Sequence, residues 1–246
     1  MNSVTLYRRV IACRKEQPAH QKGGIFMSVV VAIKEKNRIY IGADSQVTKG
    51  GTRTTLKNPN NYKIWKVDGS ENCLMGHVGN LRDSNIIRLM RNVIDDYDEF
   101  YKRVDYRFIV SYLVPEIVKR LKEAQFVKCG DNYIDYIDSS FLFAYKDVLF
   151  FINTDLSVIE IDDYIAIGSG ANEAIGSLHS TVGQDPLKRI IKAIKSSAAN
   201  DIYVDYPIII SDTETTQFEV ITEKNESKFL YKTKKEGDSE ESSGAN

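Results

Sequence analysis

The chain has 246 residues, of which 42% are hydrophobic and 27% are charged, so a single globular domain is the simplest organisation. Its formal net charge of -1 gives no overall field that would favour nucleic acid or an anionic membrane as a partner. Three histidines and three cysteines lie scattered without metal-ligand or CxxC spacing, and no apolar run approaches the roughly 20 residues that span a bilayer. We therefore expect no metal or cofactor, free thiols in a reducing compartment, and a cytoplasmic location.

The sequence of residues 1–26 does not indicate a folded segment, because its charged residues are mostly basic and its apolar runs are short. The tripeptide Lys22-Gly23-Gly24 can be encoded by a purine-rich stretch like a bacterial ribosome-binding sequence, two codons before Met27. We therefore predict that translation starts at Met27, that residues 1–26 are leader sequence, and that residues 1–27 are absent from the mature chain. A propeptide and a transit peptide are alternative interpretations.

A β-hairpin is predicted directly after this segment. The apolar runs Val29–Ile33 and Ile39–Ala43 have strand length, and Lys36-Asn37 between them suits a tight turn. Continuous apolar runs are typical of strands that are covered on both faces. The hairpin would bring Ser28 and Asp44 close together. A serine that begins a mature chain carries a nucleophilic hydroxyl and a basic α-amine on one residue.

Further along the chain, a polar loop with a glycine break is predicted over residues 45–51. Apolar runs predict strands at residues 62–67, 72–78, 141–145, 148–152, 158–161, 164–167, 207–210, 218–222 and 229–231. Helical spacing predicts helices over residues 79–97, over 108–121 with a kink or a local break at Pro115, after Gly170, and after the capping pair Asp185-Pro186. Residues 234–246 are polar and low in complexity, which predicts a disordered tail.

This order of elements is strands, two helices, strands, two helices, strands. Two sheets packed face to face, with a helix pair outside each, would cover every apolar face. The pattern alone supports only a mixed α+β class. In the predicted 79–97 helix, Ile87 and Leu89 lie beside the apolar stripe, and surplus apolar surface of this kind often marks an interface.

Five motifs together resemble the proteasome β-subunit family and, within it, the bacterial HslV-like peptidases. They follow one another in family order and are Ser28–Asp44, Lys63-Ile-Trp-Lys-Val67, Met75-Gly-His-Val-Gly79, Asp163–Gly170 and Ala198–Asp201. The resemblance implies an N-terminal-nucleophile (Ntn) hydrolase domain over residues 28–233, folded as a four-layer αββα sandwich. It also implies hydrolysis of peptide bonds.

The resemblance assigns roles to six residues. They are Ser28 as nucleophile, Lys63 as the cation that tunes its amine, Asp44 as the partner of that lysine, Gly76 as the oxyanion N–H donor, Ser169 beside the amine, and Asp201 as a supporting carboxylate. Lys66 competes with Lys63 for its role, and Ser169 is also a natural helix N-cap. His77 reads as a structural or rim residue rather than a catalytic base.

The function predicted from these residues is an N-terminal-serine endopeptidase enclosed in a homo-oligomeric ring. Its partners would be protein or peptide substrates and a ring-shaped AAA+ ATPase unfoldase. Two alternatives stay open, namely a catalytically silent ring subunit and an Ntn amidase that acts on a small molecule.

Overall fold

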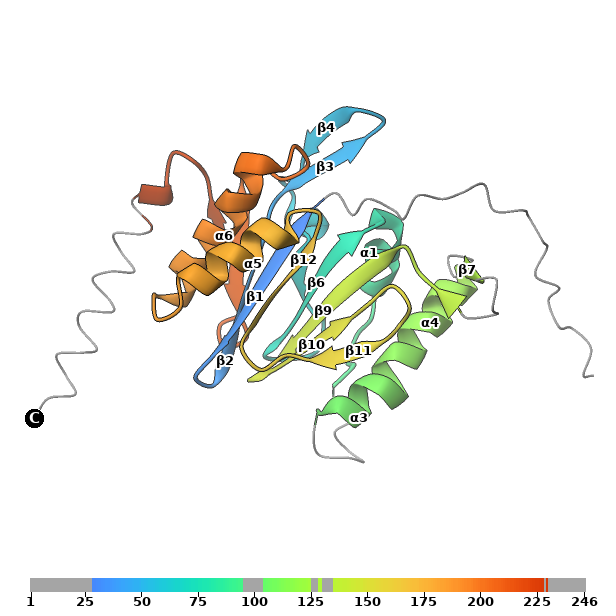
Figure 1. The fold of residues 1–246 in the computed structure, drawn as a ribbon. Helices are drawn as coiled ribbons and strands as arrows, with labels where there is room; N and C mark the ends of the chain where they lie inside the picture. The colour runs from blue at the N-terminus through green and yellow to red at the C-terminus, as the bar shows by residue number, and fades with distance from the viewer. Residues whose placement is uncertain (1–27, 95–103, 125–127, 130–134, 228, 230–246) are drawn as a thin grey trace, which may run out of the picture.

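The structure, a computed structural model, describes residues 28–94, 104–124, 128–129, 135–227 and 229. Two β-sheets stack face to face, and helices cover the outer face of each sheet (Figure 1). This arrangement confirms the predicted α+β class and the four-layer αββα sandwich. The predicted leader over residues 1–27 and the predicted tail over residues 234–246 lie outside the described residues.

The first sheet is antiparallel throughout, with the strand order β12-β1-β2-β13-β14. Its strands are β1 (Val29–Glu35), β2 (Arg38–Ala43), β12 (Tyr164–Gly168), β13 (Ile208–Asp212) and β14 (Glu219–Ile221). The predicted hairpin of β1 and β2 is confirmed, and Lys36 in its turn has a φ of 56°, which lies in the left-handed region. Because Val30 pairs with Ala43, Asp44 lies opposite Val29, and its N–H donates to the Val29 carbonyl at 3.3 Å. Ser28, the residue before Val29, therefore lies close to Asp44 at one end of the sheet.

The second sheet is also antiparallel, with the order β11-β10-β9-β6-β5. Its strands are β5 (Ile64–Lys66), β6 (Cys73–Gly79), β9 (Ser139–Tyr145), β10 (Val148–Ile152) and β11 (Val158–Glu160). Short elements outside the two sheets are the hairpin of β3 (Gln46–Lys49) and β4 (Thr52–Thr55), the 3-10 turn η1 (Pro59–Asn61), and the pair β7 (Lys128–Cys129) and β8 (Asp135–Tyr136).

Two groups of helices form the outer layers (Figure 1). The first sheet is covered by α5 (Ala171–Ser180) and α6 (Pro186–Asn200), and the second by α1 (Leu81–Ile87), α3 (Tyr106–Phe108), the π-helical segment η2 (Ile109–Leu113) and α4 (Val114–Glu123). Asp185 caps α6 as predicted, because its side chain accepts a hydrogen bond from Lys188 N at 2.9 Å. Three apolar clusters fill the three spaces between the four layers.

Strand β1 contributes to two of these clusters, which explains its uninterrupted apolar sequence. Val29, Val31 and Ile33 pack in the cluster under α5 and α6, whereas Val30 and Ala32 pack in the cluster between the two sheets. All five side chains are almost completely buried. Alternate residues of a strand point to opposite faces, so a strand that is covered on both faces needs apolar residues at every position.

The prediction of a helix over residues 79–97 is wrong beyond Ile87. The chain leaves the helix there, and Asn92 N donates a hydrogen bond to Asp68 O at 2.9 Å. The later residues with helical spacing belong to a non-helical segment, and their side chains are nevertheless buried in the core. They are Met90, Val93 and Ile94. Tyr97, the last residue of that pattern, lies outside the described residues.

Three further predictions can be compared with the structure. The expected break in the α-helix near Pro115 is confirmed. The segment directly before Val114 and Pro115 is π-helical, and Val114 N donates a hydrogen bond to Ile109 O. The predicted loop over residues 45–51 instead contains β3, and Gly50-Gly51 forms a hairpin turn with positive φ at both residues. Phe229 is helical rather than extended, and it packs against the cluster under α5 and α6.

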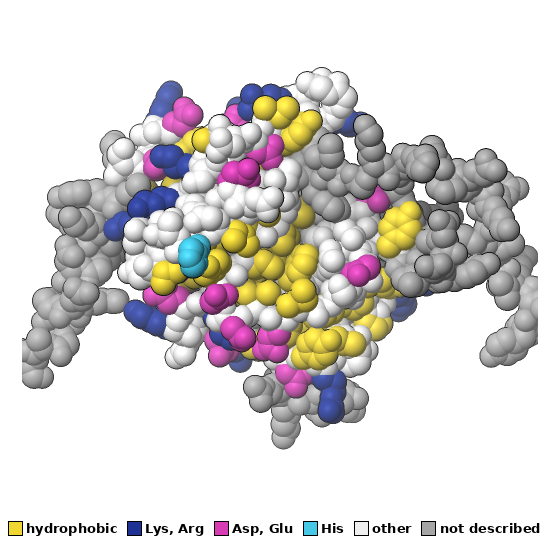
Figure 2. Space-filling model, in the orientation of Figure 1, with side chains coloured by type: hydrophobic (Ala, Val, Ile, Leu, Met, Phe, Trp, Pro, Cys, Tyr) yellow, Lys and Arg dark blue, Asp and Glu magenta, His cyan; other side chains and the backbone are white. Residues whose placement is uncertain are grey.

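The surface in Figure 2 carries apolar side chains gathered near the middle of the face shown in Figure 1. Ile159 in the edge strand β11 is 51% exposed. Of the two residues that the sequence marked as surplus apolar surface, Leu89 is 67% exposed, whereas Ile87 is buried in the core. In the part of the chain that the structure describes, no helix has both the length and the apolar content to cross a bilayer.

Candidate active site

Ser28 lies at the start of β1 and is 5% exposed. Its backbone nitrogen donates a hydrogen bond to Ser169 Oγ at 3.2 Å, and its carbonyl oxygen accepts hydrogen bonds from Ser169 Oγ at 3.3 Å and Gly170 N at 3.4 Å. Gly168 makes this approach possible, because a Cβ on it would lie 2.2 Å from the Ser28 oxygen, and its φ is 105°. The turn between β12 and α5 therefore holds the backbone of Ser28.

Ser169 contacts Ser28, as predicted, and it does not cap α5. The N-cap of that helix is Gly170, which makes no side-chain capping hydrogen bond. The Ser169 hydroxyl, with one proton and two lone pairs, both donates to and accepts from the Ser28 backbone. Of the two interpretations of Ser169, the structure supports the one that places it beside the nitrogen of Ser28.

Asp44 follows β2 and is completely buried. Its carboxylate accepts hydrogen bonds from Val29 N at 2.9 Å, Gln46 N at 2.9 Å and Lys63 Nζ at 2.7 Å. Burial raises the pKa of Asp44, and the charge and hydrogen bond of Lys63 and the two backbone N–H groups oppose this change. The carboxylate therefore links three separate segments of the chain directly beside Ser28.

Lys63 immediately precedes β5, and its side chain is 2% exposed. Besides its ion pair with Asp44, its Nζ donates to Gln46 O at 2.5 Å. Burial lowers the pKa of Lys63, whereas the negative charges of Asp44 and, after it, Asp201 favour the charged form. Lys66 is exposed and lines a different cavity, so the lysine that reaches Asp44 is Lys63.

Asp201 is the C-cap residue of α6. Its Oδ1 accepts a hydrogen bond from Tyr203 N at 2.8 Å. Its Oδ2 is buried and has no hydrogen-bond partner among the described residues. The negative charge of Asp201 acts on Lys63 by raising its pKa, so the carboxylate belongs to this site. Its Oδ2 is therefore well suited to accept a hydrogen bond from an additional N–H group there.

A small cavity of about 60 Å³ opens beside Ser28. The residues that line it come from strands and turns around Ser28 and from the start of α1, and are Ser28, Val47, Thr48, Lys63, His77, Gly79 and Leu81. Gly79 was not singled out from the sequence, although it ends the motif that contains Gly76. Its φ of 117° sets it apart from an ordinary strand residue.

Gly76 does not line this cavity. A Cβ on Gly76 would lie 2.9 Å from Val30 Cγ1 and 3.1 Å from Ile41 Cδ1, both in the cluster between the sheets. The glycine is therefore explained by the close packing of the two sheets. Of the two glycines in the motif, the geometry favours Gly79 over the predicted Gly76 as an N–H donor to a group bound beside Ser28.

His77 also lines the cavity and is 2% exposed. Its Nε2 lies 3.1 Å from Asn80 O and 3.2 Å from Ser139 Oγ. Burial, and after it the charge of Lys63, lowers the pKa of His77 to about 3. The imidazole is therefore neutral at physiological pH, which agrees with a structural role rather than that of a general base that cycles through its protonated form.

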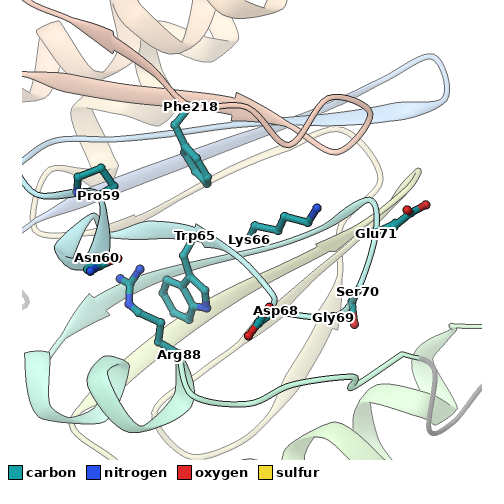
Figure 3. Close-up of a pocket in the computed structure, with 10 residues that line it drawn as sticks. All are labelled: Pro59, Asn60, Trp65, Lys66, Asp68, Gly69, Ser70, Glu71, Arg88 and Phe218. Atoms are coloured by element: carbon teal, nitrogen blue, oxygen red, sulfur yellow. The ribbon is translucent and has the colours of Figure 1, made fainter.

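A larger cavity of about 630 Å³ lies elsewhere, where β5 and η1 meet the end of α1. In Figure 3 the Arg88 guanidinium lies beside the Trp65 ring, and its Cζ is 4.5 Å from the ring centre. None of the six predicted site residues lines this cavity. Among the described residues, no group of three His, Cys, Asp or Glu side chains could hold a metal ion.

Comparisons with known proteins agree on one family. The model of the family "Proteasome subunit" matches residues 27–211. The ATP-dependent protease subunit HslV of Campylobacter concisus is 28% identical over 152 residues, which cover 61% of this chain and 75% of that protein.

Solved structures of low sequence identity share the fold. Thiobacillus denitrificans BPH superposes with a TM-score of 0.58 at 17% identity, covering 79% of this chain and 99% of that one. Eukaryotic HslV from Trypanosoma brucei superposes with a TM-score of 0.56 at 16% identity, covering 75% of this chain and 98% of that one.

Proposed function

Because this chain belongs to the proteasome subunit family, we propose that it is a peptidase of the HslV type whose nucleophile is Ser28 at the start of the mature chain. The observation that carries the proposal is the buried ion pair between Lys63 and Asp44, in which Nζ lies 2.7 Å from Oδ1. The same Asp44 oxygen accepts a hydrogen bond from Val29 N, the backbone N–H directly after Ser28. A buried ion pair is costly to desolvate, and its placement beside a potential nucleophile is typical of a catalytic site.

The proposed reaction begins when Ser28 Oγ attacks the carbonyl carbon of a peptide bond. The hydroxyl proton passes to the α-amine of Ser28, which acts as the base once the preceding residue is absent. The tetrahedral intermediate then expels the amine half of the substrate, which takes up that proton. Water hydrolyses the remaining ester, which restores the Ser28 hydroxyl and releases the acid half of the substrate.

The other site residues support these steps by charge and hydrogen bonding. The ammonium group of Lys63 would lower the pKa of the α-amine and stabilise negative charge on Ser28 Oγ. Ser169 Oγ, already 3.2 Å from the Ser28 nitrogen, would orient the amine. Asp201 Oδ2, which has no hydrogen-bond partner among the residues that the structure describes, would assist it. Gly79 N–H, at the cavity wall, would stabilise the oxyanion.

The test compares two forms of the protein, one that begins at Ser28 and one that retains residues 1–27. Hydrolysis is measured on a fluorescently labelled unfolded protein and on a mixed peptide library, so that no cleavage preference is assumed. We expect activity only from the form with a free Ser28 amine, and none from its Ser28→Ala variant. Equal activity of the long form, or of Ser28→Ala, would contradict Ser28 as the nucleophile. Inactivity of every form would favour a silent ring subunit.

For assembly, the proposal is a closed homo-oligomeric ring in the cytoplasm, supplied with substrate by a ring-shaped AAA+ unfoldase. The relative from Campylobacter concisus is named an ATP-dependent protease subunit, which supports the ATPase partner. Leu89 and Ile159 are more than half exposed, which supports contacts between subunits. A ring would also confine an active peptidase to an inner chamber, and closed cyclic symmetry buries identical interfaces on every subunit.

A further inference from the structure

The turn that joins β6 to α1 packs directly on the start of β9. This turn contains Gly79 and Asn80. A Cβ on Gly79 would lie 2.3 Å from Asp138 O and 2.7 Å from Ser139 Cα, so the backbone there has no room for a side chain. Asn80 N also donates to Asp138 O at 3.1 Å. The position of Gly79 at the cavity therefore depends on what holds this turn against β9.

Ser139, the first residue of β9, is completely buried and makes hydrogen bonds to that turn. Its Oγ donates its single proton to Asp83 Oδ2 at 2.6 Å, a short bond of the kind that a carboxylate acceptor produces. The lone pairs of the same oxygen are then available to accept from Asn80 N at 3.1 Å and from His77 Nε2 at 3.2 Å.

This network also determines the tautomer of His77. Its Nε2 faces Asn80 O at 3.1 Å, which can only accept, and Ser139 Oγ, whose proton is committed to Asp83. Nε2 therefore carries the hydrogen of the neutral ring, and Nδ1 does not. One serine hydroxyl thus connects α1, β6 and β9 at the wall of the cavity beside Ser28.

We propose that Ser139 and Asp83 are positioning residues for the peptidase site, because their hydrogen bonds hold the Gly79-Asn80 turn and the His77 ring at the cavity beside Ser28. The inference rests on the proposed function and adds two residues that do not touch the reacting atoms. The oxyanion forms only as the reaction proceeds. A displaced Gly79 N–H therefore lowers kcat and leaves KM almost unchanged.

The experiment measures kcat and KM of the form that begins at Ser28, with the peptide substrate that it cleaves best. Ser139→Ala should lower kcat by about 10- to 100-fold with KM within about twofold. The loss should be smaller than the roughly 100- to 1,000-fold that follows removal of an oxyanion donor, because the Gly79 N–H group is displaced and not removed. Ser211→Ala is the matched control. Ser211 is also a buried strand serine, but its Oγ has no hydrogen-bond partner among the described residues. The kcat of the Ser211→Ala variant should therefore equal that of the wild type.

Asp83→Asn is the second variant, and it tests the positioning role of this network even if Ser139→Ala does not fold. The amide keeps the shape of the carboxylate and one oxygen that accepts from Ser139, so the protein should fold and lose about three- to tenfold in kcat with KM unchanged. A kcat equal to the wild type in folded Ser139→Ala or in Asp83→Asn would overturn the inference. A raised KM with unchanged kcat would also overturn it. An inactive wild type with a free Ser28 amine would instead overturn the proposed function and, with it, this inference.

Discussion

Replacing Lys63 with methionine tests the centre of the proposed site. The substitution keeps most of the volume of the side chain and removes its charge. Within the described part of the chain, the completely buried Asp44 carboxylate would then keep hydrogen bonds only from Val29 N and Gln46 N. Breaking a buried ion pair by removing one partner costs about 3–5 kcal/mol. Because two backbone donors remain, we expect the free energy of unfolding to fall by about 3 kcal/mol, a large part of the roughly 5–15 kcal/mol typical of a domain.

Lys66→Met is the matched control for this change. Lys66 lies three residues further along the same segment and is exposed, so its substitution should change stability by less than about 0.5 kcal/mol. The assay is urea denaturation of both variants at one protein concentration, followed by peptide hydrolysis. Lys63→Met should lose both stability and activity, and Lys66→Met neither. The reasoning is refuted if the two variants unfold within 1 kcal/mol of each other, or if Lys66→Met is the inactive one.

Three further predictions concern the cavity and the assembly. Gly79→Ala should abolish hydrolysis, because its Cβ would meet the Asp138 carbonyl at 2.3 Å, whereas folded Gly76→Ala should keep most of its kcat; the reverse result would restore Gly76 as the oxyanion donor. His77 has a pKa of about 3 in the fold but about 6.5 in an unfolded chain, so acid favours unfolding. As the pH falls from 6.5 to 3, the free energy of unfolding, measured by urea denaturation, should therefore fall more steeply for the wild type than for His77→Phe. The difference between the two slopes should reach up to about 1.4 kcal/mol per pH unit, and equal slopes would disprove the assignment. Light scattering should give a particle several times the 27.9 kDa mass of one chain, and an active monomer would rule out the ring.

The hairpin that carries Ser28 and Asp44 could be predicted from the sequence because its signals are local. Two apolar runs and a tight turn determine which residues pair, and the pairing places the two side chains together. The helix over residues 79–97 could not be predicted correctly, because Met90, Val93 and Ile94 have helical spacing and yet reach the core from an irregular segment. Burial produced that periodicity without a helix, and a long-range hydrogen bond from Asn92 to Asp68 holds the segment in place.

The site shows the same division between local and long-range information. Lys63 and Lys66 occur in one short motif, and only the structure shows that Lys63 reaches Asp44. Gly76 and Gly79 are three residues apart, and an odd spacing places strand residues on opposite faces. One glycine therefore packs between the sheets and the other lines the cavity. The network of Ser139 and Asp83 joins residues 56 positions apart, which no local pattern could reveal.

The backbone around Ser28 is held firmly on its C-terminal side. The Ser28 carbonyl accepts from Ser169 and Gly170, and the next N–H group, that of Val29, donates to Asp44. Cutting the peptide bond before Ser28 therefore changes the protonation and hydrogen-bonding capacity of a single nitrogen and leaves the anchors after it intact. On the proposed mechanism, maturation would be a chemical switch rather than a conformational one, and an inactive precursor could be folded and assembled completely before a single cleavage turned it on.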